Sequence, residues 1–182
     1  MIGILGGMGT QAGLDFCTKL AKINRGKADQ NYPLFVLYNK ATIPDRKKNL
    51  KKYKKVLNSL LEGCKFLQKN KCKFISIPCN TAHYWYSDLK NKVKIPILNM
   101  PELVYKSASR SCKKQTKIGL LATDATIKTK IYSNFFNKLS FRWVGEMHNY
   151  QLQVRTRRHY GVNEVDGKPY QIKFNISRFF SE

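Results

Sequence analysis

Residues 74–83 read Phe-Ile-Ser-Ile-Pro-Cys-Asn-Thr-Ala-His, an apolar run that ends at a proline and is followed by residue types that favour a helix start. The pattern predicts a buried strand over Phe74–Pro78 and a helix from about Asn80 to Val93. Ligands of open α/β sheets bind at the carboxyl ends of the strands, so we expect a functional site at this junction. Cys79 lies there, where the backbone N–H groups of a helix start favour a thiolate, and it is a candidate base or nucleophile.

Strand and helix patterns alternate along most of the chain. Ile2–Leu5 is a short apolar run closed by glycines and followed by an amphipathic helix pattern from Leu14 to Ile23. Pro33–Tyr38 is continuously apolar, as expected for a strand that is buried on both faces of a parallel sheet. Further strands are predicted at 95–100 and 117–123, and further helices at 46–67, 102–109 and 124–139. This alternation predicts an α/β fold with a parallel sheet and right-handed crossovers.

An internal repeat indicates that the fold is duplicated. Ile2–Thr10 (IGILGGMGT) aligns with Ile118–Thr126 (IGLLATDAT) at one constant offset, with identical or similar residues at most positions. One such match can arise by chance, but strand, turn and helix recur in the same order, which favours a duplication. We therefore expect two similar lobes. The second is expected to be incomplete, because the same offset applied to Cys79 points beyond Glu182.

The composition is that of a globular protein with a strong positive charge. Of the 182 residues, 42% are hydrophobic, which excludes a disordered or low-complexity chain. Lys and Arg number 34 against 11 Asp and Glu, and the net charge of +23 raises the alternative of a nucleic-acid-binding module. Residues 40–73 hold 12 of these Lys and Arg, on the polar face of an amphipathic helix pattern and without interleaved exposed aromatics. A solvated helix face is the preferred interpretation, and no nucleic-acid partner is expected.

The cysteine pattern and the apolar segments argue against a disulfide-rich, a metal-binding and a membrane protein. The five cysteines lack Cys-x-x-Cys spacing, so neither a disulfide framework nor a metal site is predicted, and reduced thiols favour a cytoplasmic protein. No uncharged apolar stretch approaches the roughly 20 residues that span a bilayer. Met1–Leu5 lacks the basic residues of a signal peptide, so no membrane association is expected.

Four blocks of sequence resemble the aspartate/glutamate racemase family in order and spacing: Met1–Gly9 (MIGILGGMG), Ile43–Arg46 (IPDR), Phe74–His83 and Gly119–Thr126 (GLLATDAT). The resemblance covers residues 1 to about 138. It implies two similar α/β lobes with the active site between them, and a cofactor-independent racemase of a small acidic amino acid, aspartate or glutamate. In such enzymes one thiol from each lobe flanks the substrate Cα; one removes the proton and the other returns a proton to the opposite face. A homodimer is compatible with this interpretation.

The resemblance also implies roles for individual residues. Cys79 matches the catalytic cysteine of the first lobe. Arg46 matches an arginine that clamps the substrate side-chain carboxylate as a planar fork, which a lysine could not imitate. The remaining matches line the cleft or hold the substrate α-carboxylate; they are Met8 and Thr123 for the cleft, and Asn80 and Thr81 for the carboxylate.

Simpler interpretations of the same residues stay open. Most free cysteines are small buried residues, and position alone explains Cys79 equally well in that way. His83 lies one helical turn after Cys79 and either touches it or is satisfied by packing, and Arg46 could be a solvated loop residue. The run Gly7-Met-Gly-Thr-Gln-Ala12 also fits the GxGxxA fingerprint of a dinucleotide-binding oxidoreductase. Against that alternative, the second strand is followed by Asn39-Lys40 and not by the acidic residue that holds the ribose.

The sequence departs from the family in its last part. The second catalytic cysteine of the family lies in a Gly-Cys-Thr-Glu block, which is absent from these 182 residues, and the family motifs stop near Leu139. We divide the chain into a first lobe over 1–110, the start of a second lobe over 111–138 and an atypical tail over 139–182, where Asp166-Gly167 predicts a hairpin turn. The expected function is an impaired racemase. The alternative is a non-catalytic homologue that binds acidic amino acids.

Overall fold

The computed structural model describes residues 1–24, 26, 28–111, 117–136, 142–148, 161–165 and 168–172. Side chains are described for residues 1–24, 26, 28–110, 120 and 122–136. Cys112 and the predicted turn Asp166-Gly167 lie outside the described residues, as does much of the segment that follows His148. We call residues 1–111 the first unit and residues 117–148 the second unit.

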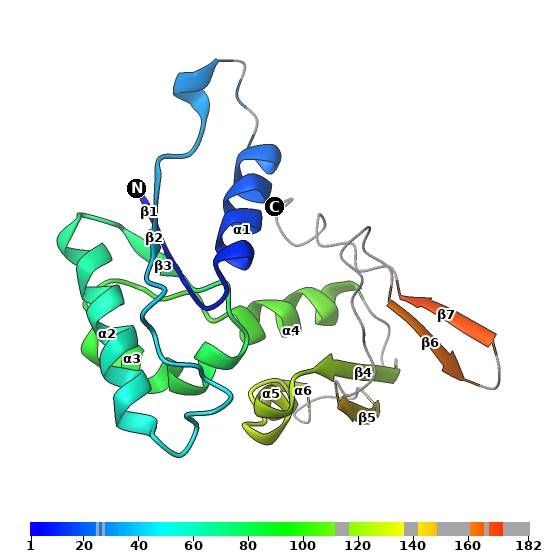
Figure 1. Ribbon diagram of the computed structural model, residues 1–182. Helices are drawn as coiled ribbons and strands as arrows, with labels where there is room; N and C mark the ends of the chain where they lie inside the picture. The colour runs from blue at the N-terminus through cyan, green and yellow to red at the C-terminus, as the bar shows by residue number, and fades with distance from the viewer. Residues whose placement is uncertain are drawn as a thin grey trace.

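The first unit is built on a three-stranded parallel sheet in the order β2-β1-β3 (Figure 1), with β1 at Ile2–Gly6, β2 at Phe35–Asn39 and β3 at Phe74–Ser76. β1 is the central strand, and its Ile4 and Leu5 are fully buried. In place of the strand predicted over 95–100, Ile97 makes a single parallel bridge to Ile75. The predicted parallel α/β architecture is confirmed.

β2 differs from its prediction. Its first four residues are half-buried and Asn39 is exposed, so the expectation of a strand buried on both faces is wrong here. The reason is its place in the sheet, because among the described strands β2 pairs only with β1 and forms an edge. A continuous apolar run is equally compatible with an edge strand whose two faces are each partly covered.

Helices cover both faces of this sheet. α1 (Thr10–Ile23) packs on one face, where a Cβ on Gly13 would lie 3.3 Å from Leu37 Cδ1. α2 (Tyr53–Lys69) and α3 (Tyr86–Lys92) lie on the other side, where Gly63 of α2 leaves room for the Leu5 side chain. The main core is on this second face, and its fully buried members include Val56, Leu60, Cys64, Leu67, Ile75, Trp85 and Leu89. Each large apolar side chain buried there contributes about 1.5–3 kcal/mol.

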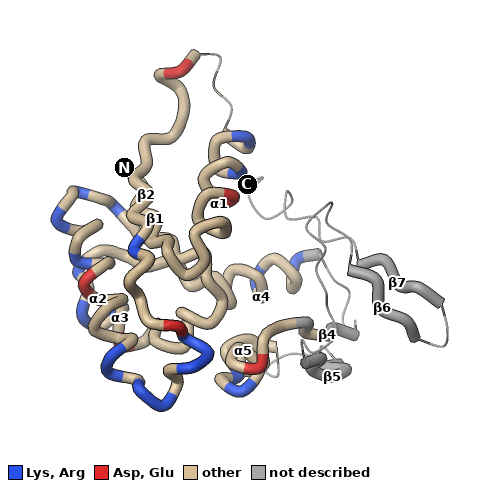
Figure 2. Tube along the Cα trace, viewed as in Figure 1, with Lys and Arg blue, Asp and Glu red and all other residues tan. Residues whose placement is uncertain are grey.

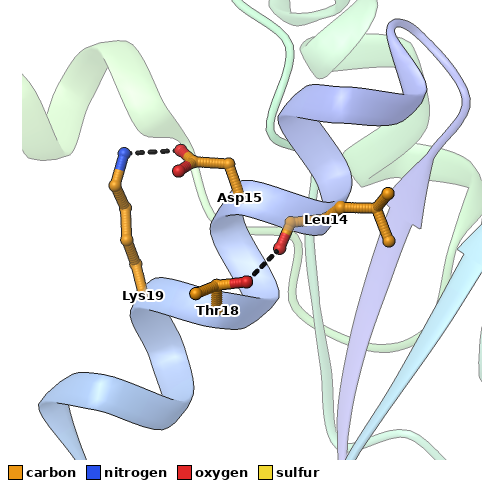
Figure 3. Close-up of polar contacts among 4 residues, drawn as sticks. All are labelled: Leu14, Asp15, Thr18 and Lys19. Carbon is orange, nitrogen blue, oxygen red and sulfur yellow. Dashed lines mark hydrogen bonds and ion pairs between the residues drawn. The ribbon is translucent and has the colours of Figure 1, made fainter. Parts of the chain in front are cut away.

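The outer face of α1 is polar (Figure 3). Lys19 Nζ lies 2.5 Å from Asp15 Oδ2, and the Thr18 hydroxyl donates to the Leu14 carbonyl at 3.0 Å. Such exposed contacts contribute at most about 1 kcal/mol each. Leu14 fits the apolar helix pattern but is 47% exposed, and its side chain leaves α1 on the side opposite to Asp15 and Lys19.

α2 starts later than its apolar pattern predicts. The helix expected from Arg46 begins only at Tyr53. Asp45 Oδ1 accepts the backbone N–H groups of Lys47 at 2.8 Å and Lys48 at 3.3 Å, and this local turn competes with a helix. The lysines of residues 47–52 would also place positive charge at the positive end of the helix dipole.

The chain after β3 forms two short helical pieces instead of the single helix predicted over 80–93. A 3-10 helix, η2 (Thr81–Trp85), runs directly into α3. Trp85 is fully buried, and its Nε1 donates to the Tyr53 carbonyl at 3.1 Å, which ties this segment to the start of α2. A longer helix than expected, α4 (Met100–Ser111), follows and leads toward the second unit.

The second unit begins, like the first, with a strand that is followed by a helix. β4 (Lys117–Ala122) pairs in parallel with β5 (Arg142–His148), so the segment after 138 adds a parallel strand. The helix predicted over 124–139 is two helices, α5 (Asp124–Lys128) and α6 (Ser133–Phe136), and Lys130 with φ +53° lies between them. β6 (Gly161–Val165) and β7 (Lys168–Ile172) pair antiparallel on either side of residues 166–167.

Four cysteines with described side chains, Cys17, Cys64, Cys72 and Cys79, are free thiols. Burial raises the pKa of the Cys64 thiol to about 12, so that thiol is unreactive at neutral pH. Within the described part of the chain, no group of three or more His, Cys, Asp or Glu side chains is arranged to hold a metal ion. None of the described helices is long and apolar enough to cross a membrane.

The turn after β1 requires glycine at one of its positions. Gly7 has φ +88°, and a Cβ there would lie 2.3 Å from the carbonyl carbon and oxygen of Lys40. Gly9 has φ −117°, and nothing lies within 4 Å of the position of its Cβ. Gly7 therefore lets this turn pack against the chain that leaves β2, and this packing sets the place of Met8.

His83 braces the turn that carries Cys79. Its Nε2 accepts the backbone N–H of Met100 at 3.1 Å, so Nδ1 carries the proton and donates to the Cys79 carbonyl at 2.9 Å. The Leu98 carbonyl lies farther from Nε2, at 3.4 Å. His83 is buried, and burial lowers its pKa below the ordinary value. The neutral ring thus joins the end of β3 to the start of α4.

We predict a large loss of stability for alanine at Gly7 and a small change for alanine at Gly9. Gly7→Ala should lower the free energy of unfolding by at least about 2 kcal/mol, because the residue adopts positive φ and its Cβ meets backbone atoms. Gly9→Ala should change it by less than about 1 kcal/mol. Urea denaturation followed by circular dichroism measures both values. Equal losses for the two variants would contradict the turn geometry.

We predict that His83 makes stability depend on pH. Its pKa is lowered from 6.5 in the folded protein, so the unfolded chain binds the proton first as the pH falls. The stabilising effect is complete above about pH 6.5 and is lost below it, with a slope of at most about 1.4 kcal/mol per pH unit. His83→Gln should show a shallower loss of unfolding free energy between pH 7 and pH 5. Parallel pH profiles of wild type and variant would refute this role.

Candidate functional site

The candidate site lies where the carboxyl ends of β1 and β3 meet. These strands pair in parallel, so the turns that follow them emerge at the same edge of the sheet. The turn after β3 holds Cys79, which is half-buried and whose backbone N–H donates to the Ile77 carbonyl at 2.7 Å. Within the described residues, the His83 ring contacts the backbone of Cys79, Leu98 and Met100 and not the Cys79 thiol. Its role is therefore to hold the turn.

Asn80 and Thr81 contact the second unit directly. The Thr81 hydroxyl lies 3.0 Å from that of Thr126, and the Tyr132 hydroxyl donates to Asn80 Oδ1 at 2.5 Å. Thr126 also lies 3.2 Å from the hydroxyl of Thr123, which accepts the Thr126 backbone N–H. Through Thr126, these hydrogen bonds connect Thr81, one of the two predicted carboxylate-binding residues, with Thr123. Neither Asn80 nor Thr81 caps η2 through its side chain, contrary to the helix-cap role expected for these residue types.

Arg46 and Met8 form a second pair. The Arg46 guanidinium donates through Nη2 to the Met8 carbonyl at 2.7 Å and through Nη1 to the Pro44 carbonyl at 3.2 Å. Its Nε is buried and has no hydrogen-bond partner within the described residues. Arg46 is half-buried, so the alternative of a solvated loop residue is wrong. The Met8 side chain packs in the main core, and its backbone carbonyl is what Arg46 contacts.

A basic pocket lies between the two units. Its volume is about 340 Å³, and its lining comes from the segment after Arg46 and from α5: Lys47, Lys48, Leu50, Thr123, Asp124, Ala125 and Lys128. Three of these side chains are positive and one is negative. Figure 2 shows that Lys and Arg gather along the segment between β2 and α2, facing α5. The resulting positive field favours an anionic ligand.

This arrangement supplies the parts of an acid–base site. Cys79 offers a thiol at the strand end, Asn80 offers an amide, and the buried Arg46 Nε–H has no partner in the part of the chain that the structure describes. Hydroxyl and amide donors near a thiol can bind a carboxylate and stabilise negative charge that develops beside it. Arg46 contacts the carbonyls of Met8 and Pro44 and not Cys79, so the predicted site residues form two separate groups.

Thr126 and Tyr132 are site residues that the sequence reasoning did not assign. Thr126 lies in the repeated block and is 1% exposed, so the block match could have identified it. Tyr132 follows the end of that block and carries no motif that would mark it. For the dinucleotide alternative, β2 ends at Asn39, whose amide donates to the Thr10 hydroxyl at 3.2 Å. A dinucleotide site would need an acidic residue there.

Comparison with known proteins gives a consistent result. The profile of the Asp/Glu/hydantoin racemase family matches residues 5–167, which extends past residue 138 and includes β5 and β6. The broad-specificity amino-acid racemase RacX of Bacillus subtilis is 32% identical over 141 residues, covering 72% of this chain and 58% of that protein. Among solved structures, the aspartate racemase of Picrophilus torridus matches with a TM-score of 0.70 and 31% identity, covering 79% of this chain and 61% of that one.

A more distant structure shares the fold. The glutamate racemase of Aquifex pyrophilus matches with a TM-score of 0.56 and 22% identity, over 77% of this chain and 52% of that one. The chain thus spans about 58–61% of the length of its more similar relatives. The family profile covers most of the sequence, and two relatives exceed 30% identity. The chain therefore belongs to the Asp/Glu/hydantoin racemase family.

Proposed function

We propose that Cys79 moves the Cα proton of a small acidic amino acid held between the two units. The observation that carries the proposal is the position of Cys79 at the end of β3, next to Asn80 and Thr81, which contact Tyr132 and Thr126 of the second unit. The relatives named above are aspartate, glutamate and broad-specificity amino-acid racemases. Aspartate or glutamate is the proposed substrate.

The proton transfer needs a base and a stabilised carbanion. The thiolate of Cys79 takes the Cα proton, the C–H bond breaks, and its electron pair moves into the α-carboxylate. Hydrogen-bond donors at the carboxylate stabilise the charge that accumulates there. The amide of Asn80 and the hydroxyl of Thr81 are the proposed donors. The thiol exchanges its proton with solvent and then returns a solvent-derived proton to the same face of the carbon, so the step needs no oxidant or reductant.

The preference for an acidic substrate rests on charge. Arg46 has a buried Nε–H without a hydrogen-bond partner within the described residues, and the pocket that begins at the next residue contains Lys47, Lys48 and Lys128. These groups favour a second carboxylate on the ligand over an apolar side chain. The overall net charge of +23 also raises the local concentration of a dianionic amino acid near the protein.

We further propose that the described residues 117–136 and 142–148 form part of a second α/β lobe. Support comes from the parallel pair β4–β5 and from the turn at Thr123, which matches the turn after β1 in the repeat. The 182 residues contain no Gly-Cys-Thr-Glu block, so Cys79 is the one proposed base of this chain. We expect exchange of the Cα proton on one face, with little inversion.

The exchange reaction tests the proposed base. Incubated with L- or D-aspartate in D2O, the wild-type chain should replace the Cα proton by deuterium, read by proton NMR, with retained configuration. Cys79→Ser should lower the exchange rate at least about a hundredfold, because a hydroxyl is a far weaker base than a thiolate. Cys17→Ser is the matched control and should retain the rate, since Cys17 lies on α1 away from the site. Equal rates for wild type and Cys79→Ser would exclude Cys79 as the base.

Ligand binding tests the role of Arg46. Arg46→Lys should weaken aspartate binding about tenfold and leave alanine binding unchanged, because only the planar guanidinium offers Nε–H while it holds the Met8 carbonyl. Isothermal titration calorimetry with both amino acids measures the difference. Lys65→Arg on α2 serves as the control substitution. An equal loss for alanine would assign Arg46 a structural role only.

The second candidate function is binding without turnover. It is favoured by the single matched cysteine of the 182 residues. Aspartate would then stabilise the wild-type protein against heat while no deuterium enters the ligand. Exchange that depends on Cys79 would exclude this candidate.

A further inference from the structure

Tyr132 makes the one described side-chain contact with the amide of Asn80. Its hydroxyl donates to Asn80 Oδ1 at 2.5 Å, across the junction of the two units. Asn80 is otherwise exposed and does not cap η2 through its side chain. The orientation of this exposed amide therefore depends on a residue 52 positions later in the chain.

The orientation of an asparagine amide decides which ligand it binds. One branch of the planar group is an acceptor and the other carries two N–H donors. If Oδ1 faced a carboxylate, two partial negative charges would repel; if Nδ2 faces it, a charge-assisted hydrogen bond forms. Since a phenol donates to Oδ1, the Nδ2 donors of Asn80 point away from Tyr132, and no described residue accepts a hydrogen bond from them.

Tyr132 is well placed to keep this contact. It is only 8% exposed and packs with Ile131 and Phe136 against α4 and β4. Burial raises the pKa of its phenol to about 12, so the hydroxyl keeps its proton at neutral pH and acts as a donor. The packed ring holds the hydroxyl in position without any contribution from the ligand.

We propose that Tyr132 is a positioning residue that orients the Asn80 amide, so that its Nδ2 donors face the α-carboxylate of a bound amino acid. This inference rests on the proposed function, because Asn80 is the proposed carboxylate donor. It adds a dependence between the units: the first unit presents a carboxylate donor only when the second unit is docked against it. Tyr132 does not touch the reacting atoms and acts through Asn80.

A double-mutant cycle tests the contact itself. The unfolding equilibrium constants of wild type, Tyr132→Phe, Asn80→Ala and the double variant are measured in urea. The Asn80→Ala substitution should raise the constant about fivefold less in the Tyr132→Phe background than in wild type, because the hydrogen bond is already lost. Effects that multiply independently would overturn the inference.

Ligand titrations then separate positioning from general stability. Tyr132→Phe should weaken binding of aspartate about tenfold, and binding of β-alanine, which is aspartate without its α-carboxylate, should be unchanged. Tyr53→Phe is the matched control, since Tyr53 is a partly buried phenol that donates to Asp88 of α3 and not to Asn80. It should leave both affinities unchanged.

The outcomes distinguish the proposed function from the positioning role of Tyr132. If Tyr132→Phe weakens both ligands equally, the residue only supports the fold and the inference is overturned. A wild-type protein that binds neither ligand overturns the proposed function and the ligand-positioning role with it, while the stability cycle still decides the Tyr132–Asn80 contact. Selective loss for aspartate together with coupling in the cycle supports the inference.

Discussion

β1 pairs in parallel with β2 on one side and with β3 on the other, and this pairing is the constraint from which the site follows. Parallel strands end at the same edge, so the glycine turn after β1 and the Cys79 turn after β3 must meet there. The pairing is held by the core between the sheet and α2, where Leu5 packs against Gly63. Disruption of that core would separate Cys79 from Met8 without any change in the site residues themselves.

Polar contacts join the two units at the same edge. The hydroxyls of Thr81 and Thr126 lie 3.0 Å apart in a buried position, and Tyr132 reaches Asn80. Buried hydrogen bonds stabilise the protein by only about 1 kcal/mol each, but a missing partner costs more. Such contacts therefore favour one docked arrangement of the units over others. That arrangement places the candidate donors beside Cys79.

The strands of the first unit and the position of Cys79 could be predicted from the sequence, because both depend on local patterns. Apolar runs next to small-residue turns fixed the three strands of the first unit, and the block Phe74–His83 located Cys79. Helix boundaries were less predictable, because periodicity does not reveal that Asp45 captures two N–H groups before α2 begins. Tyr132 cannot be found from the sequence, since its proposed role depends on a contact with Asn80, 52 residues away, which no local pattern encodes. The inference that Cys79 is a base remains a prediction.

A structure with a bound amino acid would test the central claim most directly, namely that Cys79 and Asn80 act on one ligand between the two units. Crystals of the wild-type chain grown with D- or L-aspartate should place the Cα in contact with the Cys79 thiol, and the α-carboxylate on Asn80 Nδ2 and the Thr81 hydroxyl. Aspartate bound elsewhere, or with its Cα turned away from Cys79, would contradict the account.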